Sequence, residues 1–189
     1  MRSLMVFMVL FLAVAVFPAV CLAETGAGDA GPENHEIVVA LLQMEPYGND
    51  VARNLDKAER FCRRADLMGA DIALMPEMFS IGYTRFDPEE EGAVEAFYED
   101  ALKRDSPEIQ RFSELAKELK MAIGVTYLEA WDPTPRNSIT LFDRKGREVF
   151  TYAKVHTSDF KHMESAMTPG DDFYVGPLDT AAGGCRWAP

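Results

Sequence analysis

The segment from residue 37 to residue 75 alternates between two kinds of apolar pattern, and this alternation limits the folds open to the chain. Residues 37–44 (IVVALLQM) form an apolar run rich in β-branched side chains, which predicts a buried strand of the kind found in parallel sheets. Residues 71–75 (DIALM) predict a second buried strand after Gly69. Between the two strands, apolar residues recur at steps of four and three along one helical face: Val51, Leu55, Ala58, Cys62 and Ala65. These elements predict a β-α-β unit.

The middle of the chain predicts a second helix and further strands. Ser106, Pro107 and Glu108 are typical of a helix start, with a capping hydroxyl followed by proline at the first helical position. Residues 121–129 (MAIGVTYLE) then form an apolar run of strand length. Two alternating segments flank the turn sequence Asp-Arg-Lys-Gly and predict a β-hairpin; they are residues 137–142 and 148–153. The order of these elements predicts an α/β fold.

The remaining segments carry weaker patterns. The acidic residues 86–105 predict a loop with a solvated helix. Residues 155–172 predict a loop, and residues 173–178 can begin another strand. We therefore expect one folded domain over residues 36–182, preceded by a Gly-rich flexible linker at residues 24–35.

The N-terminus has the pattern of a secretory signal peptide. Arg2 supplies a positive charge, an unbroken apolar run covers residues 4–17, and Pro18 breaks any helix. Ala23 precedes a cleavage point at Glu24 in a small–x–small pattern. The alternative is a membrane anchor retained at residues 4–23, but the apolar run is short for a span of about 20 residues. We therefore expect an exported protein, periplasmic or extracellular, that has lost residues 1–23.

Charge and cysteine content exclude several other classes of function. The formal net charge is −12, and the sequence contains no basic patch with interleaved aromatic residues, so we expect no nucleic acid partner. Cys21, Cys62 and Cys185 lack the spacing of a zinc site, so we expect no metal. A disulfide between Cys62 and Cys185 is conceivable in an exported protein. The simpler interpretation places Cys62 on the apolar face of its helix as a small buried hydrophobe.

Two charged residues directly follow predicted strands. Glu77 follows the strand DIALM, and Lys154 follows the second strand of the hairpin. Because the carboxyl ends of strands in α/β sheets open into the ligand crevice, a carboxylate and an ammonium group there can perform acid–base and oxyanion chemistry. Spacing alone favours the simpler interpretation, a surface salt bridge or a solvated loop charge.

Local sequence motifs favour the catalytic interpretation. The motifs VALLQM (39–44), GADIALMPEMFSIGY (69–83), NSITLFDRKGREVFTYAKVHTSDF (137–160) and TPGDDF (168–173) occur in the order and at the separations of a known family. In these motifs the chain resembles the N-terminal part of the carbon–nitrogen hydrolases, which include nitrilases, aliphatic amidases and carbamoylases. The resemblance covers about residues 37–182. It implies a partial four-layer α-β-β-α sandwich of the nitrilase type, truncated before the strand that carries the nucleophile.

The resemblance also implies a role for each matching residue. Glu77 matches the general base, which takes the proton of a cysteine thiol and later activates water. Lys154 matches the lysine that stabilises the oxyanion, and Glu164 matches a supporting glutamate that positions substrate and lysine. Phe79 and Tyr83 are weaker candidates for pocket residues, and a simple core position is the favoured interpretation for both. The resemblance implies no cofactor and no metal, a small amide, carbamoyl or nitrile substrate, a thioester intermediate, and a homo-oligomer in the intact form.

The cysteine nucleophile of the family has no match in this sequence. In the family it ends a strand with a sequence such as V-G-x-M-I-C-Y-D. We judge Cys185 an unlikely substitute, because Gly183 and Gly184 precede it in place of an apolar strand. The codons of the last residues, read two nucleotides later, can give Leu-Gln-Val-Gly-Ala-Met, since Trp187 has a single codon and forces the glycine. We therefore interpret residues 183–189 as an out-of-frame tail produced by a frameshift.

Two other classes of function remain open at this point. One is a secreted binding module that holds an amide or carboxylate ligand without turnover. The other is a fragment that is complemented by a separately encoded C-terminal half. Saturable binding without hydrolysis would indicate the first, and a downstream reading frame with the cysteine motif would indicate the second.

Overall fold

The computed structural model describes residues 36–83, 87, 89–158, 163–180 and 183–187. The predicted export segment (1–23) and the whole linker (24–35) lie outside these residues, as does the predicted cleavage point. None of the helices in the described ranges is long and apolar enough to cross a membrane.

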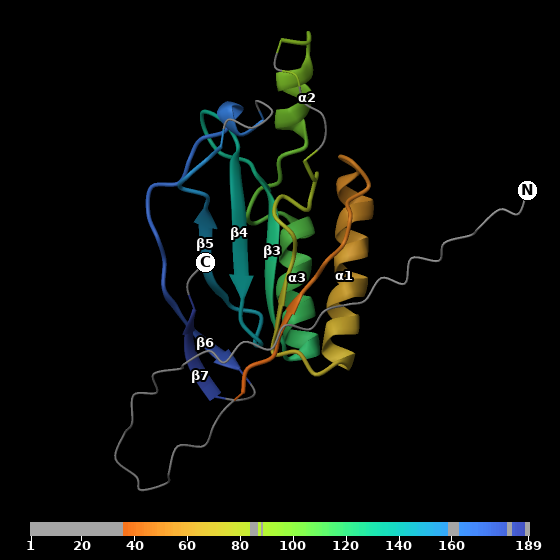
Figure 1. Ribbon diagram of the computed structural model, residues 1–189, viewed down its shortest axis with the longest axis vertical. Helices are drawn as coiled ribbons and strands as arrows, with labels where there is room; N and C mark the ends of the chain where they lie inside the picture. Colours follow the sequence, from red (N-terminus) through yellow and green to blue (C-terminus); the bar gives the residue numbers. More distant parts are fainter. Residues whose placement is uncertain (1–35, 84–86, 88, 159–162, 181–182, 188–189) are drawn as a thin grey trace, which may run out of the picture.

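A mixed five-stranded sheet forms the centre of the fold (Figure 1). Its order follows the chain: β1 (Val39–Leu41), β2 (Ile72–Leu74), β3 (Ala122–Glu129), β4 (Arg136–Phe142) and β5 (Glu148–Ala153). The first three strands are parallel, as the predicted β-α-β unit requires, and the hairpin adds β4 and β5 in antiparallel orientation. β1 and β2 are shorter than the apolar runs that predicted them.

Two amphipathic helices cover one face of this sheet, α1 (Val51–Leu67) and α3 (Pro107–Leu119) (Figure 1). Their apolar faces pack against the sheet in a core that includes Leu55, Cys62 and Phe112, each fully buried. Asp50 caps α1 by accepting a hydrogen bond from the Arg53 amide. Ser106 occupies the predicted N-cap position of α3. Its buried hydroxyl makes no capping hydrogen bond, so the prediction that this hydroxyl caps the helix was wrong.

A second apolar cluster lies on the opposite face of the sheet. Phe150 of β5 and Leu141 of β4 pack there against Leu178. Leu178 belongs to β6 (Gly176–Thr180), which forms a two-stranded antiparallel sheet with β7 (Gly183–Trp187). The strand expected to begin between residues 173 and 178 thus starts at Gly176. Most of the segment interpreted as a tail forms β7.

The solvated helix expected between residues 86 and 105 is α2 (Ala93–Glu99), whose Phe97 is buried while most of its other residues are not.

The direction of the strands determines where polar side chains gather. β2, β3 and β5 all finish at the edge of the sheet where β4 begins. Residues that follow β2 and β5, and residues that open β4, therefore meet at that edge.

We predict that the two leucines of α1 differ sharply in their contribution to stability. Leu55 is fully buried and Leu67 is 85% exposed. Leu55→Ala should lower the free energy of unfolding by about 2–5 kcal/mol, because it leaves a cavity in the core, whereas Leu67→Ala should change it by no more than about 0.5 kcal/mol. Urea denaturation monitored by circular dichroism measures both values. Equal losses would contradict the packing of α1 against the sheet.

Candidate active site

Four polar side chains meet at this edge of the sheet. Glu77 lies three residues beyond the end of β2, and Lys154 directly follows β5. Asn137 is the second residue of β4, and Glu164 begins a 3-10 turn at Glu164–Ala166. The backbone fixes two of them side by side, because the Lys154 amide donates to the Asn137 carbonyl at 2.8 Å. The cluster therefore joins segments that are far apart in the sequence.

The ammonium group of Lys154 links two carboxylates. Its Nζ donates to Oε1 of Glu77 at 2.8 Å and to Oε1 of Glu164 at 2.8 Å. The Lys154 side chain is 29% exposed, that of Glu77 is 48% exposed and that of Glu164 only 1%. Solvent therefore reaches the pair with Glu77 more readily than the pair with Glu164.

Glu164 is a buried carboxylate with several hydrogen-bond donors. Besides Lys154, the hydroxyl of Tyr83 donates to Oε1 at 2.9 Å, the amide of Asn137 donates to Oε1 at 3.1 Å, and the backbone amide of Ser158 donates to Oε2. Burial raises the pKa of this carboxyl, but the donors and the charge of Lys154 outweigh burial and lower the pKa to about 2. Glu164 is therefore a fixed negative charge at neutral pH.

Glu77 has fewer donors and more solvent contact. Burial raises its pKa, but the hydrogen bonds from Lys154 and Asn137, together with the neighbouring hydroxyl of Tyr83, lower it further than burial raises it. Glu77 is therefore ionised at neutral pH, as a base must be before it accepts a proton.

The same contacts act on the groups that donate to the two carboxylates. Burial lowers the pKa of Lys154, but the bonds to Glu164 and Glu77 raise it overall. Burial and the two neighbouring carboxylates both raise the pKa of Tyr83. Lys154 is thus a permanent cation and Tyr83 a permanent donor over the physiological pH range.

The two weaker candidates for pocket residues occupy different environments. Phe79 is fully buried in the apolar core, with its backbone amide donating to Thr126. Tyr83 is 45% exposed and places its hydroxyl against Glu164. The favoured interpretation of Tyr83 as simple core was therefore wrong, because its ring reaches the charged cluster.

Sequence reasoning did not identify Asn137 as a site residue. It is the first residue of one quoted motif, but an asparagine at the start of a strand has many ordinary uses, such as ending a turn. Only the sheet register brings its side chain beside Glu77, which is 60 positions away in the sequence, and Glu164, which is 27 positions away.

Within the described ranges, Cys62 and the backbone of Cys185 lie in elements away from this cluster. Cys62 is a free, fully buried thiol within the core between α1 and the sheet, and burial together with the negative Glu59 raises its pKa to about 12. It therefore remains a protonated core residue, as predicted. Cys185 lies in β7, opposite Leu178 in β6. Figure 1 shows this small sheet near the end where β4 finishes, whereas the cluster lies where β4 begins.

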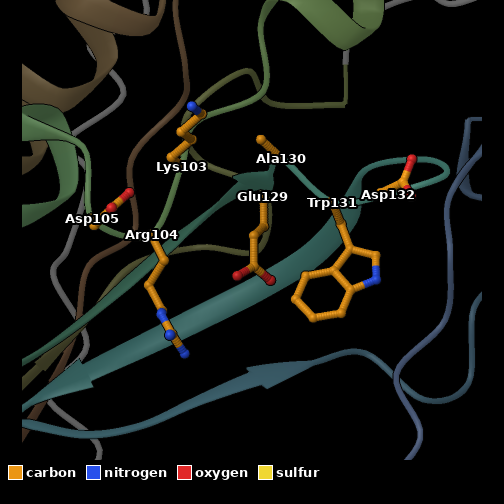
Figure 2. Close-up of a pocket in the computed structure, with 7 residues that line it drawn as sticks. All are labelled: Lys103, Arg104, Asp105, Glu129, Ala130, Trp131 and Asp132. Carbon is orange, nitrogen blue, oxygen red and sulfur yellow. The ribbon is translucent and has the colours of Figure 1, made fainter.

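A separate depression of about 490 Å³ lies beside the end of β3. Figure 2 shows the Glu129 carboxylate pointing into it, among Lys103, Arg104, Asp105, Ala130, Trp131 and Asp132. In the sheet register Glu129 faces Arg136, whereas Leu128 faces Asn137. Because neighbouring residues of a strand point to opposite faces, this depression and the carboxylate cluster lie on opposite faces of the sheet.

Within the described ranges, no group of three or more His, Cys, Asp or Glu side chains could hold a metal ion.

Comparison with known proteins identifies the family of the chain. The carbon-nitrogen hydrolase family model matches residues 38–185. The chain belongs to the carbon–nitrogen hydrolase family. N-carbamoylputrescine amidase from Arabidopsis thaliana is 33% identical over 77% of this chain and 45% of its own length. Nitrilase 3 from the same plant is 28% identical over 77% of this chain and 44% of its own length. The chain thus spans about half the length of the curated relatives it matches.

Solved structures share the fold of this carbon–nitrogen hydrolase chain. One is a CN-hydrolase superfamily protein from Xanthomonas campestris with an arsenic adduct in its active site; it has a TM-score of 0.63 and 18% identity, and the match covers 80% of this chain and 51% of that protein. Another is a mutant of the amidase from Nesterenkonia sp. AN1 in complex with butyramide; it has a TM-score of 0.59 and 22% identity, over 79% of this chain and 53% of that amidase. These matches confirm the predicted α/β fold of nitrilase type.

We predict that Glu164 makes the stability of the fold depend on pH. Because its folded-state pKa lies below its ordinary value of 4.5, its ionised form stabilises the fold above about pH 4.5, and this contribution is lost as the pH falls toward 2. The lowering corresponds to at most about 3 kcal/mol. Glu164→Gln should therefore be less stable than the wild type at pH 7 and close to it near pH 2, as measured by urea denaturation.

The matched control for this prediction is Glu114→Gln, which changes an exposed glutamate of α3. Its unfolding curves should follow those of the wild type at each pH. If Glu164→Gln and wild type lose stability in parallel between pH 5 and pH 2, Glu164 does not carry the dependence.

Proposed function

We propose that this chain supplies the Glu77–Lys154–Glu164 part of the active site of a hydrolase that cleaves carbon–nitrogen bonds in small amide, carbamoyl or nitrile compounds. The observation that carries the proposal is one ammonium group held by two carboxylates of unequal exposure at the carboxyl edge of the sheet. The names of the relatives support the substrate class, since they include N-carbamoylputrescine amidase and nitrilases. The Nesterenkonia amidase was solved in complex with acrylamide and with butyramide.

In the proposed reaction of an amide, a cysteine thiol loses its proton to Glu77 as the sulfur attacks the carbonyl carbon. The electron pair of the C=O bond moves to the oxygen, and Lys154 stabilises that oxyanion. When the oxyanion collapses, the C–N bond breaks and the leaving amine takes the proton from Glu77. Water then attacks the thioester while Glu77 accepts its proton, releasing the acid and restoring the thiol. A mutant of the Nesterenkonia amidase carries a covalent adduct from fluoroacetamide at its active-site cysteine, which supports this type of nucleophile.

The unequal environments of the two glutamates suit this division of roles. Glu164 keeps its ion pair with Lys154 in a buried position, so the lysine can turn toward an oxyanion without losing its partner. Glu77 is half exposed and can approach both a thiol and a water molecule. The same lysine thus serves the oxyanion while Glu77 exchanges protons.

We propose that the nucleophile comes from a segment other than the described residues. Neither Cys62 nor Cys185 lies in the cluster, and the codons of the last residues allow an apolar strand in a shifted frame. The direct test is to sequence the gene across codons 180–189 and several hundred bases beyond. One inserted or lost base that restores V-G-x-M-I-C supports the proposal. An intact stop without a cysteine motif in any downstream frame overturns the proposed enzyme and leaves ligand binding as the alternative.

We predict that turnover of the restored-frame protein depends on Glu77. Glu77→Gln keeps the size of the side chain but removes the base, so kcat/KM for carbamoyl and amide substrates should fall by at least about 100-fold. Ammonia release from a panel of N-carbamoyl amines, aliphatic amides and nitriles measures this loss. Glu114→Gln is the control and should keep full activity, because Glu114 is exposed on α3. Equal activity of Glu77→Gln and wild type would exclude Glu77 as the base.

We also propose that residues 1–23 direct export and are then removed. The apolar run at residues 4–17 and the small residue Ala23 before Glu24 support this proposal. Mass spectrometry of the protein recovered from the periplasm or the medium should show an N-terminus at Glu24. Recovery of the full-length chain in the membrane fraction would instead indicate a retained anchor.

A further inference from the structure

One side-chain amide contacts three other members of the cluster. Nδ2 of Asn137 lies 2.8 Å from Oε1 of Glu77, 3.1 Å from Oε1 of Glu164 and 3.3 Å from the hydroxyl of Tyr83. Asn137 is only 6% exposed. A side-chain amide nitrogen carries two hydrogens, so it can donate to both carboxylates at once.

We propose that Asn137 is a positioning residue that holds Glu77 and Glu164 on the same ammonium group and leaves one oxygen of Glu77 free to exchange a proton. This inference rests on the role proposed for the cluster. Asn137 and Lys154 both donate to Oε1 of Glu77, so neither contact occupies Oε2 of that half-exposed carboxylate. The anchored oxygen, Oε1, fixes the direction of the side chain, and Oε2 is the oxygen that we assign to proton exchange.

An amide suits this position better than a charged donor. Two carboxylates that share one lysine repel each other, and each needs further donors to remain ionised. A second cation would neutralise the cluster and compete for the oxyanion role of Lys154. The amide of Asn137 donates twice and adds no net charge, so Lys154 remains the sole cation of the cluster among the described residues.

The backbone makes this placement rigid. The carbonyl of Asn137 accepts from the amide of Lys154 at 2.8 Å, so the residue that orients the carboxylates also fixes the start of the lysine side chain. Asn137 faces Leu128 across the β3–β4 pair, on the sheet face opposite α1 and α3. A strand position supported on both sides holds a side chain more accurately than a loop does.

The test is the titration of Glu77 in the 189-residue chain, followed by ¹³C NMR of its side-chain carboxyl and assigned with Glu77→Gln. The groups that face this carboxyl are Lys154, Tyr83 and Glu164, and all three are unchanged in the variants. Asn137→Ala removes one donor to the ionised form, so the midpoint should rise by up to about one pH unit. Asn137→Asp adds a carboxyl group in place of the donor and should raise the midpoint further.

The matched control is Ser138→Ala, one residue along β4. Ser138 is equally buried, and its hydroxyl donates to Glu129 on the other face of the sheet at 2.6 Å. Its loss should cost stability without moving the Glu77 midpoint. A rise in Asn137→Ala and none in Ser138→Ala supports a positioning role. An unchanged midpoint in Asn137→Ala, or an equal rise in both variants, overturns it.

A measurement on the wild-type chain covers the case in which Asn137→Ala does not fold. The side-chain amide protons of Asn137 should exchange slowly with solvent, and their resonances should move with the same midpoint as the Glu77 carboxyl. Fast exchange, or resonances that do not follow Glu77, would contradict the proposal. Neither titration requires turnover, so a failure of Asn137 as a positioning residue is distinguishable from a failure of the proposed hydrolase.

Discussion

Two carboxylates share one ammonium group at the edge of the sheet, and the chemistry proposed for this chain depends on that interaction. Oε1 of Glu77 and Oε1 of Glu164 each lie 2.8 Å from Nζ of Lys154. Without the cation, repulsion between the two negative charges would raise the pKa of one of the carboxylates. With it, both remain ionised and differ in their surroundings: Glu164 is enclosed by donors, whereas Glu77 faces solvent. In the proposed reaction, the lysine therefore separates a structural carboxylate, Glu164, from a reactive one, Glu77.

The sheet topology makes this shared ion pair possible. β2 and β5 run in the same direction, so Glu77 and Lys154 leave the sheet at one edge although 77 positions separate them. β4 runs between β3 and β5 in the opposite direction, so its first residues open at the same edge. A hairpin added to a parallel sheet thus contributes a side chain from the start of one strand and another from the end of the next. The polar cluster follows from strand direction rather than from sequence proximity.

This origin explains which parts could be predicted from the sequence. Periodicity predicted the β-α-β unit and the hairpin, because burial on one or both faces leaves a pattern in each element by itself. Strand ends then made Glu77 and Lys154 candidates, and the family motifs favoured them. Asn137 and Tyr83 left no comparable signal, because their partners become neighbours only after the sheet register is fixed. The direction of the Glu77 pKa shift depends on the same long-range contacts, because burial raises this pKa and the hydrogen bonds lower it further.

The residues between Glu77 and Glu164 contain every group of the acid–base cluster: two carboxylates, an ammonium group, an amide and a phenol hydroxyl. Their mutual hydrogen bonds need no thiol, so the cluster can be ordered before a nucleophile is present. The carboxylate of Glu164 is buried, so a thiol cannot readily approach it, whereas the carboxylate of Glu77 is half exposed to solvent. A nucleophile that loses its proton to Glu77 must therefore approach from the solvent side of that carboxylate. Residues that complete the site are thus expected to cover Glu77 and lower its exposure, which would bring its pKa closer to that of the thiol it must deprotonate.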